Sequence, residues 1–154
     1  MNLIDYVEVR EEKIHVVKSC NEEFTLSINN DNIYYISEIK NLDKLQYLNK
    51  LLLFGKNIKK LSGLSQLINL KQLWVEGNHI EEISGLDNLK SLEYLRIARN
   101  NIKEIKGLDS LQDLRVLFLD KNQISEIKGL ENLVNLASLY LQENKITEIK
   151  GLDS

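Results

Sequence analysis

Apolar residues recur along this chain with a period of 22 residues, and polar residues fill the intervals between them. Each copy opens with two leucines three residues apart, continues with two apolar residues spaced by two, and ends with Gly-Leu. The copies begin at Leu45, Leu67, Leu89, Leu111 and Leu133, with no insertion between them. A repeat of this length is typical of a solenoid, in which each unit packs only on its neighbours.

The closely spaced apolar pair predicts a short β-strand in every copy, because a spacing of two places both side chains on one face of a strand. These pairs are Leu51/Leu53, Leu73/Val75, Leu95/Ile97, Leu117/Leu119 and Leu139/Leu141. One copy cannot bury its apolar side chains alone, whereas copies stacked at the interstrand spacing of about 4.8 Å can. We therefore expect one parallel sheet. A 22-residue unit leaves room only for an extended return path or a short 3₁₀ turn.

The spacing of apolar residues in 24–44 predicts an irregular repeat. Its first apolar positions keep the spacing of the later copies, but Ile39 and Leu42 arrive three residues late. An insertion of this size is expected in a loop or on the convex side, where it leaves the register of the strand unchanged.

Residues 1–23 predict an N-terminal cap. Alternation of β-branched residues in 6–9 and 13–17 is typical of short strands, which could pair as a hairpin. Alternatively, the spacing of Val7, Val9 and Ile14 resembles that of Leu26, Ile28 and Ile33, as in a worn repeat. The worn repeat is the preferred interpretation, and either form would cover the apolar end of the solenoid.

The motif Leu-x-x-Leu-x-x-Leu-x-Leu-x-x-Asn-x-Ile-x-x-Ile-x-Gly-Leu resembles the consensus of leucine-rich repeats. Its length and ending are most similar to the class found in protein phosphatase 1 regulatory subunits and bacterial internalins. The resemblance implies a curved α/β-type solenoid with a parallel β-sheet on its concave face and short 3₁₀ or extended segments on its convex face. It also implies partner binding on the concave face. The expected organisation is one structural domain: the cap 1–23, the irregular repeat 24–44, and five repeats over 45–154.

A recurring asparagine precedes the isoleucine of four copies: Asn78, Asn100, Asn122 and Asn144. Because a buried amide can both donate to and accept from backbone groups, we interpret this row as structural rather than as a ligand site. Lys56 replaces the asparagine in the first strict copy, which predicts a weaker turn there.

Charge and composition narrow the class of partner. The chain holds 20 Lys and Arg against 23 Asp and Glu, for a net charge of -3. Without a basic excess, we expect neither nucleic acid nor an anionic membrane as a partner. No leader-like or membrane-spanning apolar run is visible. Cys20 is the single cysteine and is expected to be a small buried residue; a lone thiol fits a reducing compartment, so we predict a cytoplasmic location.

Catalytic, cofactor and metal sites are not predicted, and the chain is expected not to be an enzyme. The two histidines, His15 and His79, lie in different repeats, whereas a zinc site needs three or four converging ligands. Glutamates recur at one position of the later copies, at Glu82, Glu104, Glu126 and Glu148, and the last three are followed two residues later by Lys106, Lys128 and Lys150. We interpret this column as a solvated edge whose charges are compensated.

The candidate binding surface consists of the strand positions that point away from the core. Its middle column is Leu52, Trp74, Arg96, Phe118 and Tyr140, and the flanking columns hold residues such as Lys50 and Ala98. Half of the ten aromatic residues fall in these columns. Strand propensity alone would also favour them there, but a contiguous exposed apolar patch usually marks an interaction site. The predicted partner-binding residues are Phe54, Trp74, Glu76, Tyr94, Arg96, Arg99, Phe118, Asp120, Tyr140 and Gln142.

These features predict a non-enzymatic module that binds a protein or peptide partner on its concave face. One alternative is self-assembly or docking through the uncapped edge of the C-terminal repeat, including a homodimer. Another is that the chain is the repeat part of a larger regulatory protein.

Overall fold

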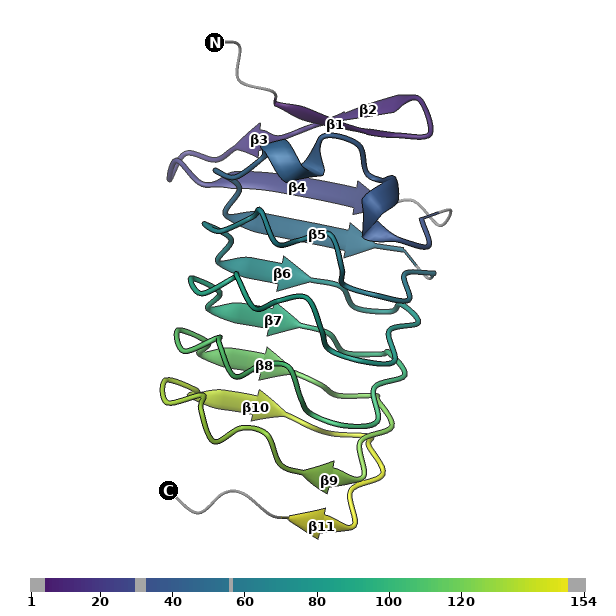
Figure 1. The fold of residues 1–154 in the computed structure, drawn as a ribbon, viewed down its shortest axis with the longest axis vertical. Coiled ribbons are helices and arrows are strands. Elements are labelled where there is room, and N and C mark those ends of the chain that lie inside the picture. The colour runs from purple at the N-terminus through teal and green to yellow at the C-terminus, as the bar shows by residue number, and fades with distance from the viewer. Residues whose placement is uncertain (1–4, 30–32, 56, 150–154) are drawn as a thin grey trace.

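A seven-stranded sheet runs along the whole solenoid in the order β10-β8-β7-β6-β5-β4-β3 (Figure 1). The computed structural model describes residues 5–29, 33–55 and 57–149. Strands β4 to β8 and β10 pair in parallel, and β3 pairs with β4 in the antiparallel sense. The strands are β3 (Val17–Lys18), β4 (Phe24–Asn29), β5 (Lys50–Phe54), β6 (Gln72–Trp74), β7 (Tyr94–Arg96), β8 (Val116–Phe118) and β10 (Ser138–Tyr140).

Residues that pair between neighbouring strands of the regular repeats are separated by the period of the sequence. Leu73 pairs with Leu51 on one side and with Leu95 on the other, each 22 residues away. Equivalent positions of successive copies therefore form straight columns across the sheet. In the irregular repeat, Leu26 pairs with Leu51 in the same columns, so the insertion leaves the strand register intact.

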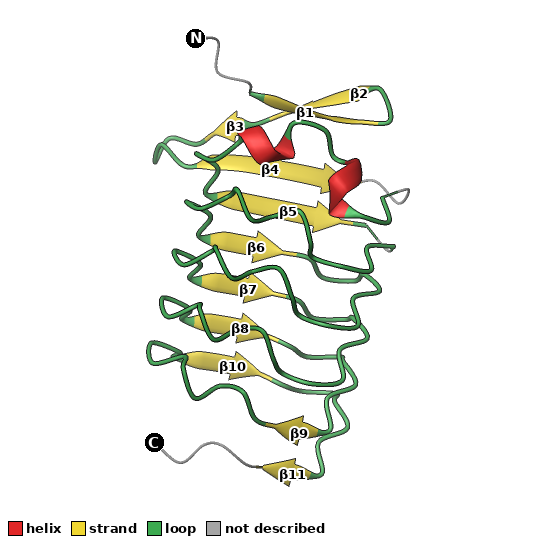
Figure 2. Cartoon of the chain, in the orientation of Figure 1, coloured by secondary structure: helices red, strands yellow, loops and turns green. Residues whose placement is uncertain are grey.

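The return path of each repeat consists of tight turns rather than helix (Figure 2). The N–H of Leu67 donates to the carbonyl of Leu64, and Leu70 donates to Leu67; the later copies repeat this pattern. Such bonds between residues three apart are those of 3₁₀ structure. The irregular repeat contains two short 3₁₀ helices, η1 (Ile36–Glu38) and η2 (Leu42–Lys44). The described residues contain no α-helix, so strands and turns build this solenoid.

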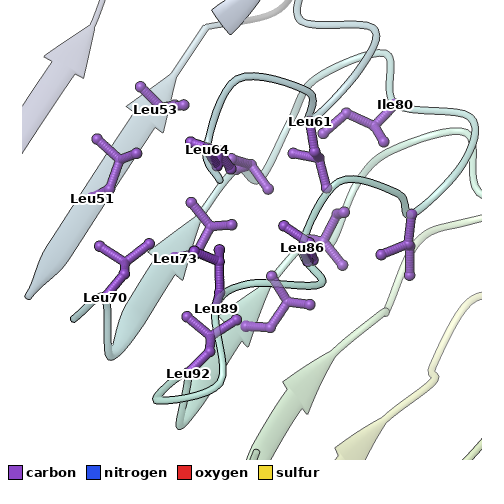
Figure 3. Packing of buried hydrophobic residues seen from close by; sticks show 14 of the residues in the cluster. Leu51, Leu53, Leu61, Leu64, Leu70, Leu73, Ile80, Leu86, Leu89 and Leu92 are labelled. Carbon is purple, nitrogen blue, oxygen red and sulfur yellow. The ribbon is translucent and has the colours of Figure 1, made fainter. Parts of the chain in front are cut away.

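The hydrophobic core lies between the sheet and the return path (Figure 3). Leu51, Leu73, Leu95 and Leu117 are fully buried, as the spacing of the strand pairs predicts. Their counterpart Leu139 is only partly buried, because it belongs to the last described strand of the sheet.

The N-terminal cap is a hairpin of β1 (Tyr6–Val9) and β2 (Glu12–His15). The preferred interpretation of residues 6–15 as a worn repeat is therefore wrong, and the hairpin alternative is correct. Arg10 and Glu11 both have positive φ, 48° and 72°, which is the backbone of a tight two-residue hairpin turn. Val7 and Val9 are buried against the core, so the hairpin covers the first apolar layer.

A second, two-stranded parallel sheet joins β9 (Glu126–Ile127) to β11 (Glu148–Ile149), apart from the main sheet (Figure 1).

The asparagine row forms a ladder of hydrogen bonds between repeats. Asn100 Oδ1 accepts from the N–H of Ile80 at 3.0 Å, and Nδ2 donates to the carbonyls of Val75 and Ile97 at 3.0 and 3.1 Å. Asn78 and Asn122 repeat this pattern, and all three are buried. The predicted structural role is confirmed. The prediction at Lys56 lies outside the described residues.

Candidate functional site

The outer face of the sheet, on the side opposite the core, carries the candidate site. Strand pairing aligns Leu52, Trp74, Arg96, Phe118 and Tyr140 in one column across five strands. Their side chains alternate with the buried leucines and therefore point outward. The arrangement of this column follows directly from the 22-residue period.

Side chains in this column stack on one another. Lys50 Nζ lies 4.6 Å from the ring centroid of Trp74, and Arg96 Cζ lies 5.7 Å from that centroid and 4.8 Å from that of Phe118. The rings of Phe118 and Tyr140 are parallel to within 6°, with centroids 4.3 Å apart. Cation–π contacts and ring stacking thus join Lys50, Trp74, Arg96, Phe118 and Tyr140 into what we call the stacked column.

Glu76 fixes the cations at the centre of the outer face. Arg96 Nε donates a hydrogen bond to Glu76 Oε2, and Arg99 Nε lies 3.3 Å from Glu76 Oε1. The hydrogen bond to Glu76 raises the pKa of Arg96 above its ordinary value; the charges of Glu76 and Asp120 add to this, and burial opposes it. Arg96 is therefore a permanent cation that Glu76 holds in place between two aromatic rings.

The ten predicted partner-binding residues lie on the outer face or directly beside it. Phe54, Tyr94 and Tyr140 are exposed by 36%, 40% and 38%, and Arg99 and Gln142 are also exposed. The other five are half-buried: Trp74, Glu76, Arg96, Phe118 and Asp120. Their role in binding stays a prediction.

Two expected exposures are wrong. Ala98 lies in an outer column but is fully buried. Cys20 is exposed rather than buried, because it lies in the turn between β3 and β4.

The sequence interpretation missed two features of the site. Lys50 was assigned only to a flanking column, yet it closes one end of the stacked column, since Leu52 offers no ring to Trp74. Arg99 and its counterparts Lys121 and Glu143 have left-handed backbone, with φ of 54°, 56° and 57°. Gly77, at the same repeat position with φ of 70°, and Gly55 one copy earlier are the signals in the sequence for that conformation.

The acidic column on the other side of the solenoid is charge-compensated, as predicted. Lys106 Nζ lies 3.2 Å from Glu82, and Lys128 Nζ lies 2.9 Å from Glu126. Among the described residues, no group of three or more His, Cys, Asp or Glu is arranged to hold a metal ion. In the same part of the chain, no helix is long and apolar enough to span a membrane.

Comparison with known proteins identifies the repeats. Residues 90–132 and 112–154 match the family model described as Leucine Rich repeats (2 copies). Comparison with curated protein sequences finds no match.

Solved structures show the same solenoid. An internalin, InlF, of Listeria monocytogenes is 29% identical with a TM-score of 0.68 over 81% of this chain and 40% of its own. Internalin C2 of the same species is 25% identical with a TM-score of 0.58 over 84% of this chain and 74% of its own. The ectodomain of the Arabidopsis thaliana receptor kinase GASSHO1/SCHENGEN3, solved in complex with CASPARIAN STRIP INTEGRITY FACTOR 2, is 25% identical with a TM-score of 0.58 over 67% of this chain and 13% of its own.

The comparisons agree with the residue positions described above. The matched copies carry the first strand leucine of both earlier copies and the asparagine of the copy that begins at Leu67. The likeness to internalins, which the repeat length and ending implied, is confirmed. The chain spans 40% of the length of InlF, so it corresponds to part of that protein. Residues 90–154 of this chain thus match the leucine-rich repeat family, and 81% of the chain has the same fold as the internalin InlF.

Proposed function

We propose that this chain is a non-enzymatic interaction module that binds a protein or peptide partner on the outer face of its sheet. Leucine-rich repeat proteins generally mediate protein–protein interaction, and one similar ectodomain was solved in complex with CASPARIAN STRIP INTEGRITY FACTOR 2. The observation that carries the proposal for this chain is the stacked column, a continuous row of aromatic and cationic side chains on a partly exposed face.

The stacked column supplies the residue types that dominate binding hot spots, since Trp, Tyr and Arg are enriched there. Its side chains are held in place before binding by Glu76 and by each other. A partner therefore loses little free energy to ordering this surface, so a few contacts suffice for measurable affinity.

The test compares partner capture by the wild-type chain and two double variants. Trp74→Ala with Phe118→Ala removes two rings of the stacked column, and capture should fall by at least about tenfold. Ile68→Ala with Val134→Ala is the matched control, because both side chains are exposed, by 50% and 78%, but lie in the return path. Equal capture by all three folded proteins, verified by circular dichroism, would refute binding on the outer face.

A second candidate function is self-association through β10. This strand ends the main sheet within the described residues, and four apolar residues of its repeat are only partly buried: Leu136, Leu139, Leu141 and Ile146. An unpaired strand edge beside exposed apolar surface favours pairing with a second chain. Light scattering should show mass rising with concentration, and Ala137→Lys at this edge should reverse it. A constant monomer mass would exclude this candidate.

A further inference from the structure

The stacked column turns the edges of its rings, not their faces, toward a partner. Lys50 and Arg96 come from the strands on either side of Trp74, and both cations lie over its ring. Phe118 lies between Arg96 and Tyr140 in the same way. A nucleobase, a sugar or a proline could stack on such a ring only after displacing a cation from it. The exposed ring edge carries partial positive charge and attracts oxygen acceptors.

The ion pairs of the outer face leave an excess of positive charge. Glu76 is shared by Arg96 and Arg99, and on the rim before the strands Glu93 is shared by Lys71 and Arg115, at 3.9 and 4.0 Å. Each group of one carboxylate and two cations has a surplus of one positive charge. Lys121 and Glu143 neutralise each other at 3.1 Å. With Lys50 and Asp120 included, the face has more positive than negative side chains in a chain of net charge -3.

Two polar groups at one end of the stacked column have no acceptor among the described residues. The indole N–H of Trp74 is buried and donates to no atom there. Lys50 forms a cation–π contact with the same ring, but no carboxylate of the described chain pairs with it. A buried donor without an acceptor is unfavourable, so an incoming oxygen that receives this hydrogen bond gains free energy on binding.

From these observations we infer that the partner presents an acidic segment of polypeptide to the outer face. A Glu or Asp carboxylate of that segment pairs with the Lys50 ammonium and accepts from the Trp74 N–H once the Lys50 side chain moves off the ring. Neighbouring acidic side chains meet the excess charge around Arg99 and Arg115. This inference rests on the proposed function, because it names the chemistry of the partner that the same face binds.

The test uses labelled peptides of equal length in which every third residue is Glu, Gln or Lys and the others are Gly, Ser and Leu. Anisotropy at low ionic strength should show the Glu peptide binding about tenfold or more tightly than the Gln peptide, with the Lys peptide weakest. Added salt should weaken only the Glu peptide. Trp74 is the single tryptophan of the chain, so a change in intrinsic fluorescence on binding places the peptide on the outer face.

Variants locate the carboxylate contact. Lys50→Gln and Trp74→Phe should each weaken the Glu peptide several-fold more than the Gln peptide, because the first removes the ammonium and the second removes the indole N–H together with one ring. Lys103→Gln is the control for net charge, since Lys103 is exposed in the return half of its repeat and should have no effect.

The outcomes separate this inference from the proposed function. Equal affinity for the Glu and Gln peptides with a change in Trp74 fluorescence would overturn the acidic segment but keep binding on the outer face. Binding of none of the peptides would overturn the acidic segment as well, while capture that still depends on Trp74 and Phe118 would keep the proposed function. A single-stranded oligothymidylate that competes as well as the Glu peptide would show general anion binding and would also overturn the inference.

Discussion

The buried asparagines join the repeats through bonds that no other side chain of similar size could make in the same place. The Asn100 amide accepts one backbone N–H from the preceding repeat and donates to carbonyls of both repeats, so donors and acceptor are satisfied together. An apolar residue at this position would leave backbone groups unpaired inside the core.

Replacing Asn100 by Ala should therefore lower the free energy of unfolding by about 3 kcal/mol, because it strands the buried Ile80 N–H and removes one of the two amide donors at each of the Val75 and Ile97 carbonyls. Asn144 makes the same bonds in a half-buried site, where water can replace the amide, so Asn144→Ala should cost about 1 kcal/mol. Urea denaturation of both variants measures the difference. Equal costs would contradict this account of the ladder.

Two constraints favour glycine at Gly107, which lies at the end of a repeat: its backbone conformation and the space around it. Only the first of these constraints applies at Gly77. Gly107 and Gly77 have φ of 72° and 70°, which favours glycine at both. A Cβ at Gly107 would also overlap the carbonyl oxygen of Ile83, while a Cβ at Gly77 meets nothing within 4 Å. We expect Gly77→Ala to cost about 1 kcal/mol and Gly107→Ala about 3 kcal/mol or more. Thermal unfolding of the two proteins would test this order, and a smaller loss for Gly107→Ala would count against the backbone contact.

At the scale of elements, side-chain amides join the turns that begin successive return paths. Asn88 Nδ2 donates to the carbonyl of Ser65, and Asn132 Nδ2 donates to Asp109 Oδ1, in each case one repeat earlier. Ser110 occupies the same repeat position, but its hydroxyl is too short to bridge the turns and is buried without a partner.

Ser110→Asn should complete this row and stabilise the chain by about 1 kcal/mol, because it replaces an unsatisfied hydroxyl with a bond between neighbouring turns. Ser125→Asn is a suitable control, since Ser125 is exposed and lies at a different repeat position. Calorimetry should show a higher Tm for Ser110→Asn only. A lower Tm would indicate that the turn cannot accommodate the amide.

At the scale of the whole molecule, the sequence predicted those features that depend on period and burial. Columns such as Leu51, Leu73 and Leu95 follow from a period that equals the strand register. The hairpin was not the preferred form of the cap, because spacing does not reveal that Arg10 and Glu11 adopt positive φ. In the candidate site, the middle column was predictable, but its stacking depends on rotamers that the period does not determine. For the same reason, the contact of Lys50 with Trp74 and the covering of Ala98 emerged only from the structure.

A solenoid held by contacts between neighbouring repeats should lose stability towards an open end. Leu95 and Leu139 occupy the same repeat position, yet Leu95 is fully buried between two strands whereas Leu139 is partly exposed on the last described strand of the sheet. Leu95→Ala should therefore cost about 4 kcal/mol and Leu139→Ala about 1 to 2 kcal/mol. Hydrogen exchange of the wild-type chain should show the same gradient, with amides of β7 exchanging near the global unfolding rate and those of β10 through local opening.

Equal protection of the two strands, together with equal costs of the two substitutions, would mean that the chain unfolds as one unit or that β10 is covered by a second molecule. Repeating the exchange at two protein concentrations distinguishes these cases, because only an intermolecular contact gains protection as the concentration rises.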